Sequence, residues 1–265
     1  MNDAVLVERR DGVVLCTLNR PEKKNAIDTA MWEALIALCD EVQERPDDRV
    51  LVFTGAGDGF CSGADLTPGG AGSGPTSPGG LGGALAGMRQ VGRTALRLHQ
   101  LSKPTIAAVN GVAAGAGCNL ALGCDLIYAS DQARFSEIFT RRGLVVDFGG
   151  SWLLPRLVGL HRAKELVFTA DVIDANEADR IGLVNRVVPH AELLEHAMSV
   201  ATKLAKLAPN QLAVNKKLLH QSYSVTMAEA LEFESVAQAA NFASRDTAEA
   251  MIAFVEKREP NFTGE

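Results

Sequence analysis

Residues 55–66 read GAGDGFCSGADL and residues 110–119 read NGVAAGAGCN, and both segments are rich in glycine and other small residues. Each lies between a predicted strand and a predicted helix. Small residues let backbone N–H groups approach a ligand closely, and a helix N-terminus adds the positive end of its dipole. Two such N–H groups directed at one point would form an oxyanion hole, which stabilises the charge of an enolate or a tetrahedral intermediate.

Two other interpretations of the same segments need no oxyanion. The segments could be tight turns that allow close helix packing. A dinucleotide-binding Gly-x-Gly-x-x-Gly motif fits less well, because neither segment follows a first strand with an acidic residue about twenty positions later. From these residues alone, the oxyanion hole and the plain turn both remain open.

Strands and helices alternate around the two segments. Residues 5–7 and 13–18 flank Asp11-Gly12, which predicts a β-hairpin with a type I′ turn. The apolar pattern predicts further strands at 50–54, 105–110 and 124–130, and helices at 25–44, with Asp28 as N-cap, and at 115–123. Strands interleaved with short helices over the first 190 residues predict a mixed α/β layered core.

After Val188-Pro189 the pattern becomes helical. Helices with apolar residues on more than one face need a partner surface, either on the core or on a neighbouring subunit. We therefore expect two parts, a core over residues 1–190 and a C-terminal helical region over residues 191–265. The helices of the second part are predicted at 190–208, 210–222, 226–243 and 246–257.

Residues 67–87 differ in composition from the rest of the chain. They contain nine of the 25 glycines and three of the prolines. Such a stretch buries too little apolar surface to offset its ordering entropy, so we expect a surface loop before a helix resumes at 89–101. Whether that loop forms a lid over a site is left open.

Composition excludes several classes of protein. Of the 265 residues, 47% are hydrophobic and 22% charged, which provides a sizeable core and excludes disorder for most of the chain. The net charge is −6 and basic residues cluster only in pairs, so nucleic acid is not an expected partner. Five cysteines without paired Cys-x-x-Cys spacing predict neither a disulfide framework nor structural zinc, and the five histidines follow no metal-binding pattern.

Targeting signals are also missing from the sequence pattern. The first residues lack the basic start and apolar run of a secretory signal, and no stretch of eighteen apolar residues predicts a membrane span. We therefore expect a protein of the reducing cytoplasm, with no membrane partner.

The residue sequence of the glycine-rich segments resembles the motifs of one known family. In order and spacing, over essentially the whole chain, the sequence is similar to the crotonase, or enoyl-CoA hydratase/isomerase, superfamily. The matching motifs are GFCSGADL (59–66), KPTIAAVNG (103–111), GAGCNLALGCD (115–125), NRP (19–21) with NA (25–26), GLVNRV (182–187) and AFVEKR (253–258).

The resemblance implies a fold and a binding site. The implied fold is a crotonase-type spiral of ββα units followed by a C-terminal helical oligomerisation region, generally in trimers or dimers of trimers. The two oxyanion-hole amides of the family fall on Ala64 and Ala116. The family usually has glycine at the second position, but alanine retains the N–H group. The substrate is a coenzyme A thioester, and no further cofactor or metal is implied.

At the acid–base positions this sequence departs from the hydratases of the family. Those enzymes use two glutamates, because syn addition of water needs both a base and a proton donor. The first glutamate position is Asn119 here, and the second aligns with Phe139. Hydration by the two-glutamate mechanism is therefore not expected.

Asp147 is the candidate catalytic residue. It lies in GLVVDFGG (143–150), which looks like the family variant in which an aspartate enters the pocket, found in isomerases and related dehalogenases. An apolar setting should raise its pKa and make it a base near neutrality. One carboxylate can move a proton across an allylic system. The alternative role for Asp147 is N-capping of a helix over 149–158.

Other residues receive binding or structural roles. The resemblance implies that the coenzyme A moiety is framed by Lys24, Ala26, Ala64, Asp65 and Leu66, and by Phe254 and Lys257 of a neighbouring subunit. Asp65 is expected to tie down its loop rather than react. Glu137 could enter the site only if the strand register slips, so we expect it to be solvated.

Three functions follow as hypotheses. The first is an enoyl-CoA isomerase that uses Asp147 as proton shuttle. The second is an enoyl-CoA hydratase that adds water to a 2-enoyl-CoA. The third is a non-catalytic acyl-CoA-binding protein that has kept the fold.

Overall fold

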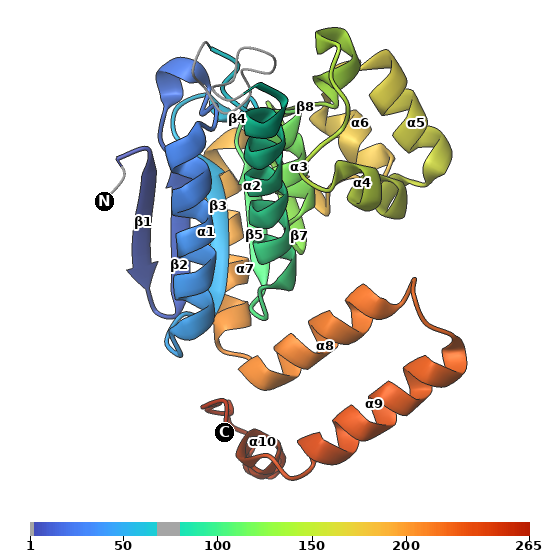
Figure 1. Ribbon diagram of the computed structural model, residues 1–265. Helices are drawn as coiled ribbons and strands as arrows, with labels where there is room; N and C mark the ends of the chain where they lie inside the picture. The colour runs from blue at the N-terminus through green and yellow to red at the C-terminus, as the bar shows by residue number, and fades with distance from the viewer. Residues whose placement is uncertain (1–2, 68–79) are drawn as a thin grey trace.

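A six-stranded sheet forms the centre of the molecule in the computed structural model, which describes residues 3–67 and 80–265 (Figure 1). The strand order is β1-β2-β3-β5-β7-β10, and only the β1–β2 pair is antiparallel. Asp11 and Gly12 both have positive φ, as a type I′ turn requires, so the predicted hairpin is confirmed. The strands are β1 (Val5–Arg10), β2 (Val13–Leu18), β3 (Val50–Gly55), β5 (Thr105–Val109), β7 (Leu126–Ser130) and β10 (Arg186–Val188).

Alternate side chains of this sheet enter two separate cores, because successive residues of a strand point to opposite faces. In β3, Leu51 and Phe53 join one cluster and Val50 and Val52 the other. Helices α1 (Thr29–Glu44) and α2 (Gly80–Gln100) cover the first face, and α7 (Leu193–Ala205) covers the second (Figure 1). The predicted N-cap of α1 is confirmed, since the Asp28 carboxylate accepts a hydrogen bond from the Met31 amide at 2.9 Å.

A smaller sheet carries the two glycine-rich segments side by side. Its order is β4-β6-β8-β9, and β4 pairs in parallel with β6. Its strands are β4 (Gly59–Cys61), β6 (Val112–Ala114), β8 (Arg134–Ser136) and β9 (Ile173–Asp174). The helices around it are α3 (Ala116–Leu122), α4 (Gly150–Val158), α5 (Leu160–Thr169) and α6 (Ala175–Arg180), with short 3₁₀ turns at Pro21–Lys23, Ile138–Arg142 and His190–Glu192. The mixed α/β core is confirmed.

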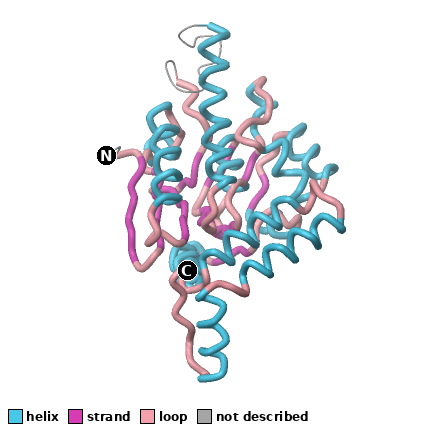
Figure 2. The backbone as a smooth tube through the Cα atoms, turned by 60° about the horizontal axis from the view of Figure 1, so that its bottom comes forward, coloured by secondary structure: helices cyan, strands magenta, loops and turns pink. Residues whose placement is uncertain are grey.

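The chain ends in helices that extend away from both sheets (Figures 1 and 2). They are α8 (Pro209–Gln221), α9 (Met227–Asn241) and α10 (Arg245–Glu256), and together with α7 they confirm the four predicted C-terminal helices. Neither α8 nor α9 has a buried residue, whereas α7 packs on the sheet through Leu193, Ala197 and Ala201. The division into residues 1–190 and 191–265 stays a prediction.

The loop predicted for residues 67–87 is wrong at its C-terminal end. Helix α2 begins at Gly80. All three prolines of the stretch precede this residue, and Leu81, Leu85 and Met88 recur at helical spacing. The glycines of this first part cost roughly 1 kcal/mol each relative to alanine, which weakens the helix without breaking its hydrogen bonds as proline would. Residues 68–79 lie outside the described part of the chain.

Membrane insertion by a helix has no support in the described residues. Of the helices within 3–67 and 80–265, none combines the length and the apolar character needed to cross a bilayer.

Candidate active site

The first glycine-rich segment exposes one backbone amide. The Ile27 amide donates to the Gly63 carbonyl at 2.8 Å, and the Ile27 carbonyl accepts from the Asp65 amide at 2.9 Å. This bridge uses the polar groups on either side of Ala64. The Ala64 N–H therefore faces away from Ile27, and no acceptor for it occurs among the described residues.

At the start of α3, the second segment leaves another amide without an acceptor among the described residues. Ala116 is the first residue of that helix, so its N–H has no acceptor within the helix. The preceding Gly115 has φ 53° and ψ −127°, a conformation that favours glycine. The helix thus begins abruptly, with its amide directed out of its N-terminus.

Two glycines bring these segments into contact. A Cβ atom on Gly63 would lie 3.5 Å from the Ala116 amide nitrogen, and one on Gly117 would lie 2.2 Å from the Cys61 carbonyl oxygen. The N-terminus of α3 is therefore pressed against the end of β4. The structure brings the segments of Ala64 and Ala116 together, and the role of their amides as an oxyanion hole stays a prediction.

Asp147 lies between the 3₁₀ turn Ile138–Arg142 and α4. Its side chain does not cap α4, which starts after Gly149 without any side-chain cap, so the capping alternative is wrong. The Asp147 Oδ1 atom is buried and has no hydrogen-bond partner among the described residues. Burial raises the pKa of Asp147 to about 6. Near neutral pH this group is an ionised carboxylate that is more basic than an exposed aspartate.

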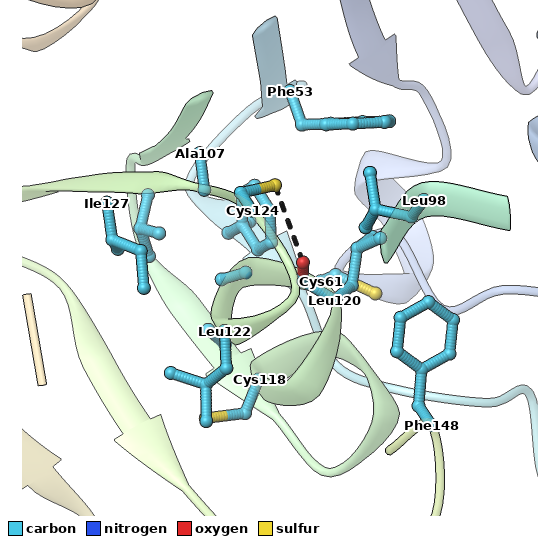
Figure 3. Close-up of a cluster of buried hydrophobic side chains, with 14 of the residues drawn as sticks. Phe53, Cys61, Leu98, Ala107, Cys118, Leu120, Leu122, Cys124, Ile127 and Phe148 are labelled. Carbon is cyan, nitrogen blue, oxygen red and sulfur yellow. Dashed lines mark hydrogen bonds between the residues drawn. The ribbon is translucent and has the colours of Figure 1, made fainter. Parts of the chain in front are cut away.

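Phe148 anchors Asp147 to the core, a role the sequence did not indicate. Its φ is 50°, in the left-handed region that phenylalanine rarely adopts. The ring is 2% exposed and lies 5.5 Å from the Trp32 ring, centroid to centroid. Figure 3 shows it beside Leu98 and Leu120 in the core cluster. Packing against these residues holds the backbone next to the carboxylate in place.

Asn119 connects α3 to the Asp147 turn. The Asn119 side chain is fully buried, and its Nδ2 donates to the Asp147 carbonyl at 3.0 Å and to Glu137 Oε2 at 3.3 Å. A Cβ atom on Gly150 would lie 2.3 Å from the same Nδ2, so only glycine fits there. Phe139 is also buried and packs near Gly115. Neither Asn119 nor Phe139, the two glutamate positions of the hydratases, offers a carboxyl group.

Glu137 is buried, and the prediction of a solvated residue is wrong. Its side chain is 2% exposed, and burial raises its pKa to about 7, with a further contribution from the nearby Asp147 charge. Strand β8 ends at Ser136, so the alternation of strand side chains does not predict on which side Glu137 lies.

Asp65 ties down the loop around Ala64, as expected. Its carboxylate accepts from Arg20 Nη2 and Lys23 Nζ, both at 2.9 Å. Burial alone would raise the pKa of Asp65, but hydrogen bonds from Thr67, Lys23 and Arg20 hold it well below its usual range. Both oxygens of the Asp65 carboxylate therefore already accept hydrogen bonds.

The other predicted coenzyme A residues fall in two places. Lys24 forms an ion pair with Asp58, Ala26 is buried, and Leu66 is half exposed. Lys24 and Ala26 lie just before Ile27, which bridges to Ala64, and Leu66 follows Ala64 by two residues. Phe254 and Lys257 belong to α10 and its C-cap, which lie at the opposite end of the molecule from β4 and α3 (Figure 1). The single chain therefore does not bring them to the site, and their binding roles stay predictions.

The cysteines are core residues. All five are free and buried, as predicted, and burial raises the pKa of Cys39 and of Cys61 to about 12. Such thiols carry no thiolate at neutral pH and are not nucleophiles.

Known proteins with similar sequences and structures show the family of this chain. The family model described as enoyl-CoA hydratase/isomerase matches residues 8–265. The chain is 38% identical over 266 residues to the 1,2-epoxyphenylacetyl-CoA isomerase of Escherichia coli, covering 100% of both chains. It is 37% identical to the short-chain-enoyl-CoA hydratase of Clostridium acetobutylicum, over 96% of this chain and 95% of that protein.

The fold comparison is equally extensive. The crystal structure of an enoyl-CoA hydratase from Bacillus anthracis superposes with a TM-score of 0.93 at 33% identity, covering 99% of this chain and 100% of that one. The expected fold class, including the C-terminal helices, is thereby confirmed. With a family match and relatives that span nearly its whole length, the chain belongs to the enoyl-CoA hydratase/isomerase family.

Proposed function

We propose that this enzyme shifts a carbon–carbon double bond of an enoyl-CoA, with Asp147 as the proton shuttle. One observation carries the proposal: the Asp147 carboxylate, with a buried and unpartnered oxygen, lies on the turn that Asn119 connects to α3, while the two glutamate positions hold Asn119 and Phe139. Relatives named as isomerase and as hydratase are both consistent with the family chemistry.

The reaction begins when the thioester oxygen accepts hydrogen bonds from the Ala64 and Ala116 amides. The Asp147 carboxylate takes a proton from the carbon alpha to the thioester of a 3-enoyl-CoA. The electron pair of the broken C–H bond moves into a dienolate, whose negative charge rests on the thioester oxygen. Asp147 then returns the same proton to the gamma carbon, which restores the carbonyl and leaves the double bond conjugated with it.

The proposal extends to coenzyme A binding and to the assembly of the chains. Lys24, Ala26, Ala64, Asp65 and Leu66 are proposed to frame the coenzyme A moiety. Phe254 and Lys257 are proposed to reach it from a neighbouring subunit of a homotrimer or a dimer of trimers, in the cytoplasm. Exposed apolar side chains on α9 and α10 support such a contact; they include Leu231, Val236, Phe254 and Val255.

Hydration is the second candidate function, favoured by the hydratase names of several relatives. It needs an acid and a base around one water, and the two-glutamate pair is replaced in this chain. A third candidate, acyl-CoA binding without turnover, is compatible with the oxyanion hole alone.

A direct assay separates these candidates. The purified protein should convert a 3-enoyl-CoA into the conjugated 2-enoyl-CoA, which is detected as new absorbance of the conjugated thioester. Offered a 2-enoyl-CoA, a hydratase would instead remove that absorbance. Loss of absorbance from 2-enoyl-CoA with no isomerisation of 3-enoyl-CoA would overturn the proposal, as would binding without turnover across a panel of acyl-CoA esters.

A further inference from the structure

Three buried oxygens with no hydrogen-bond donor belong to residues at the candidate site. They are Asn119 Oδ1, Glu137 Oε1 and Asp147 Oδ1, and none has a partner among the described residues. Buried acceptors without donors are costly, and two ionised carboxylates in such a place would be costlier still. A proton kept on one carboxyl group would supply a donor and leave one negative charge instead of two.

Glu137 is the group better placed to keep that proton. It is 2% exposed, whereas Asp147 is only partly buried. The Cys118 thiol on α3 lies next to its carboxyl, and Cys118 and Asp147 are the titratable groups that act on it in the described part of the chain. The elements packed around it present apolar side chains to a shared cavity of about 10 Å³; these are Leu154 of α4, Leu166 of α5, Ile173 of β9 and Leu183.

Glu137 reaches the candidate base through Asn119. Oε2 of Glu137 accepts from Asn119 Nδ2, and the same Nδ2 donates to the Asp147 carbonyl. The accepting oxygen fixes which way the Asn119 amide is turned, and so keeps its NH₂ group on the Asp147 turn. Burial raises the pKa of Glu137 to about 7, above the value of about 6 for Asp147, which is the order this arrangement requires.

We propose that Glu137 is a positioning residue that works in its protonated form: it orients Asn119, and through it the Asp147 turn, while Asp147 carries the only negative charge of the site. The inference rests on the proposed function of Asp147 as base. It adds a second carboxyl group, at a position other than the two glutamate positions of the hydratases.

Ionisation of Glu137 should abolish catalysis at this site. The new charge lies close to the Asp147 carboxylate, and like charges in a buried place repel strongly. Glu137 is enclosed and cannot turn toward water, whereas Asp147 is partly exposed and can. The Asp147 carboxylate then moves away from the substrate. We therefore expect kcat to fall at alkaline pH, as Glu137 loses its proton, and at acid pH, as Asp147 gains one.

The pH dependence of kcat in two variants tests this. Glu137→Leu removes the acceptor for Asn119 and should lower kcat roughly tenfold, the scale of one buried hydrogen bond, with little change in KM. Glu137→Gln keeps a neutral acceptor and donor of the same size, so it should restore most of that loss and abolish the alkaline limb. A Gln variant as slow as the Leu variant, or one that retains the limb, would overturn the proposal.

A matched control and a second readout separate this idea from the proposed function. Ile173→Val alters the same cavity wall without a titratable group, and both limbs should persist. The unfolding temperature, measured without substrate, tests the proton on Glu137 even if the reaction is not a double-bond shift. The pKa of Glu137 is raised from 4.5 to about 7 on folding, so stability should fall as pH rises through that window. That fall should be smaller in Glu137→Gln, and an equal fall would contradict the inference.

Discussion

Asp147→Asn should lower kcat by about 10²-fold or more while leaving the Kd for an acyl-CoA within about threefold, because it removes a positioned acid–base group and little else. The amide has the size of the carboxyl group, and the fold is held by Phe148 and by the Asn119 bond to the Asp147 backbone carbonyl, both of which survive. Steady-state kinetics with a 3-enoyl-CoA and equilibrium binding of an inert acyl-CoA measure the two effects separately.

Asp171→Asn is the matched control for this substitution. Asp171 is an exposed aspartate paired with Arg141, and such surface pairs contribute little, so neither kcat nor Kd should change. In the wild type, kcat should fall below pH about 6, because protonation of Asp147 removes the base. Unchanged turnover in Asp147→Asn would eliminate the isomerase assignment.

Gly117→Ala should lower kcat by about 10²–10³-fold, the scale of losing one oxyanion-hole donor. The added Cβ would lie 2.2 Å from the Cys61 carbonyl oxygen and 2.7 Å from its carbon. These are backbone atoms of β4, so the contact is relieved only by moving α3 away from that strand. The Ala116 amide then separates from the Ala64 amide. Overpacking of this kind should also lower stability by about 1–3 kcal/mol.

Gly92→Ala provides the comparison for the glycine substitution. Gly92 lies in α2, and a Cβ atom there would meet open space. That variant should keep full activity and gain up to about 1 kcal/mol, since alanine is the better helix former. Thermal unfolding and kcat, measured on both variants, test the geometry. Normal kcat in Gly117→Ala would show that the two amides do not work as a pair.

Local patterns predicted those elements that have a strong local signal. Asp11-Gly12 marked the hairpin, and Asp28 marked the start of α1. The prediction of a loop over residues 67–87 was wrong for its last residues, because their glycine content was taken as a loop signal. Proline stops a helix, and all three prolines of this stretch come before Gly80, where α2 begins. The first turns of α2 followed from apolar spacing that was present in the sequence.

The parts of the site that consist of backbone groups within a sequence motif could be predicted. The parts where side chains from distant segments meet were harder to predict. Ala64 and Ala116 came from family motifs, and the structure brings their two segments into contact at Gly63 and Gly117. Glu137 was misjudged, because its burial depends on α4, α5 and β9, which pack over it from far along the chain. Sequence spacing carries no information about such contacts.

The role of Phe148 also could not be predicted from the sequence. Its position after Asp147 gives no hint of a left-handed backbone or of packing against Trp32, more than one hundred residues earlier. The residue that holds the candidate base was therefore visible only in three dimensions.

The central claim is that one thioester oxygen meets two backbone amides beside a single carboxylate. A crystal structure of Asp147→Asn with a 3-enoyl-CoA bound tests it most directly. The thioester oxygen should lie about 2.7–3.1 Å from the amide nitrogens of Ala64 and Ala116, with side chain 147 at the alpha carbon. A thioester bound away from these amides, or an alpha carbon facing a different carboxyl group, would contradict it.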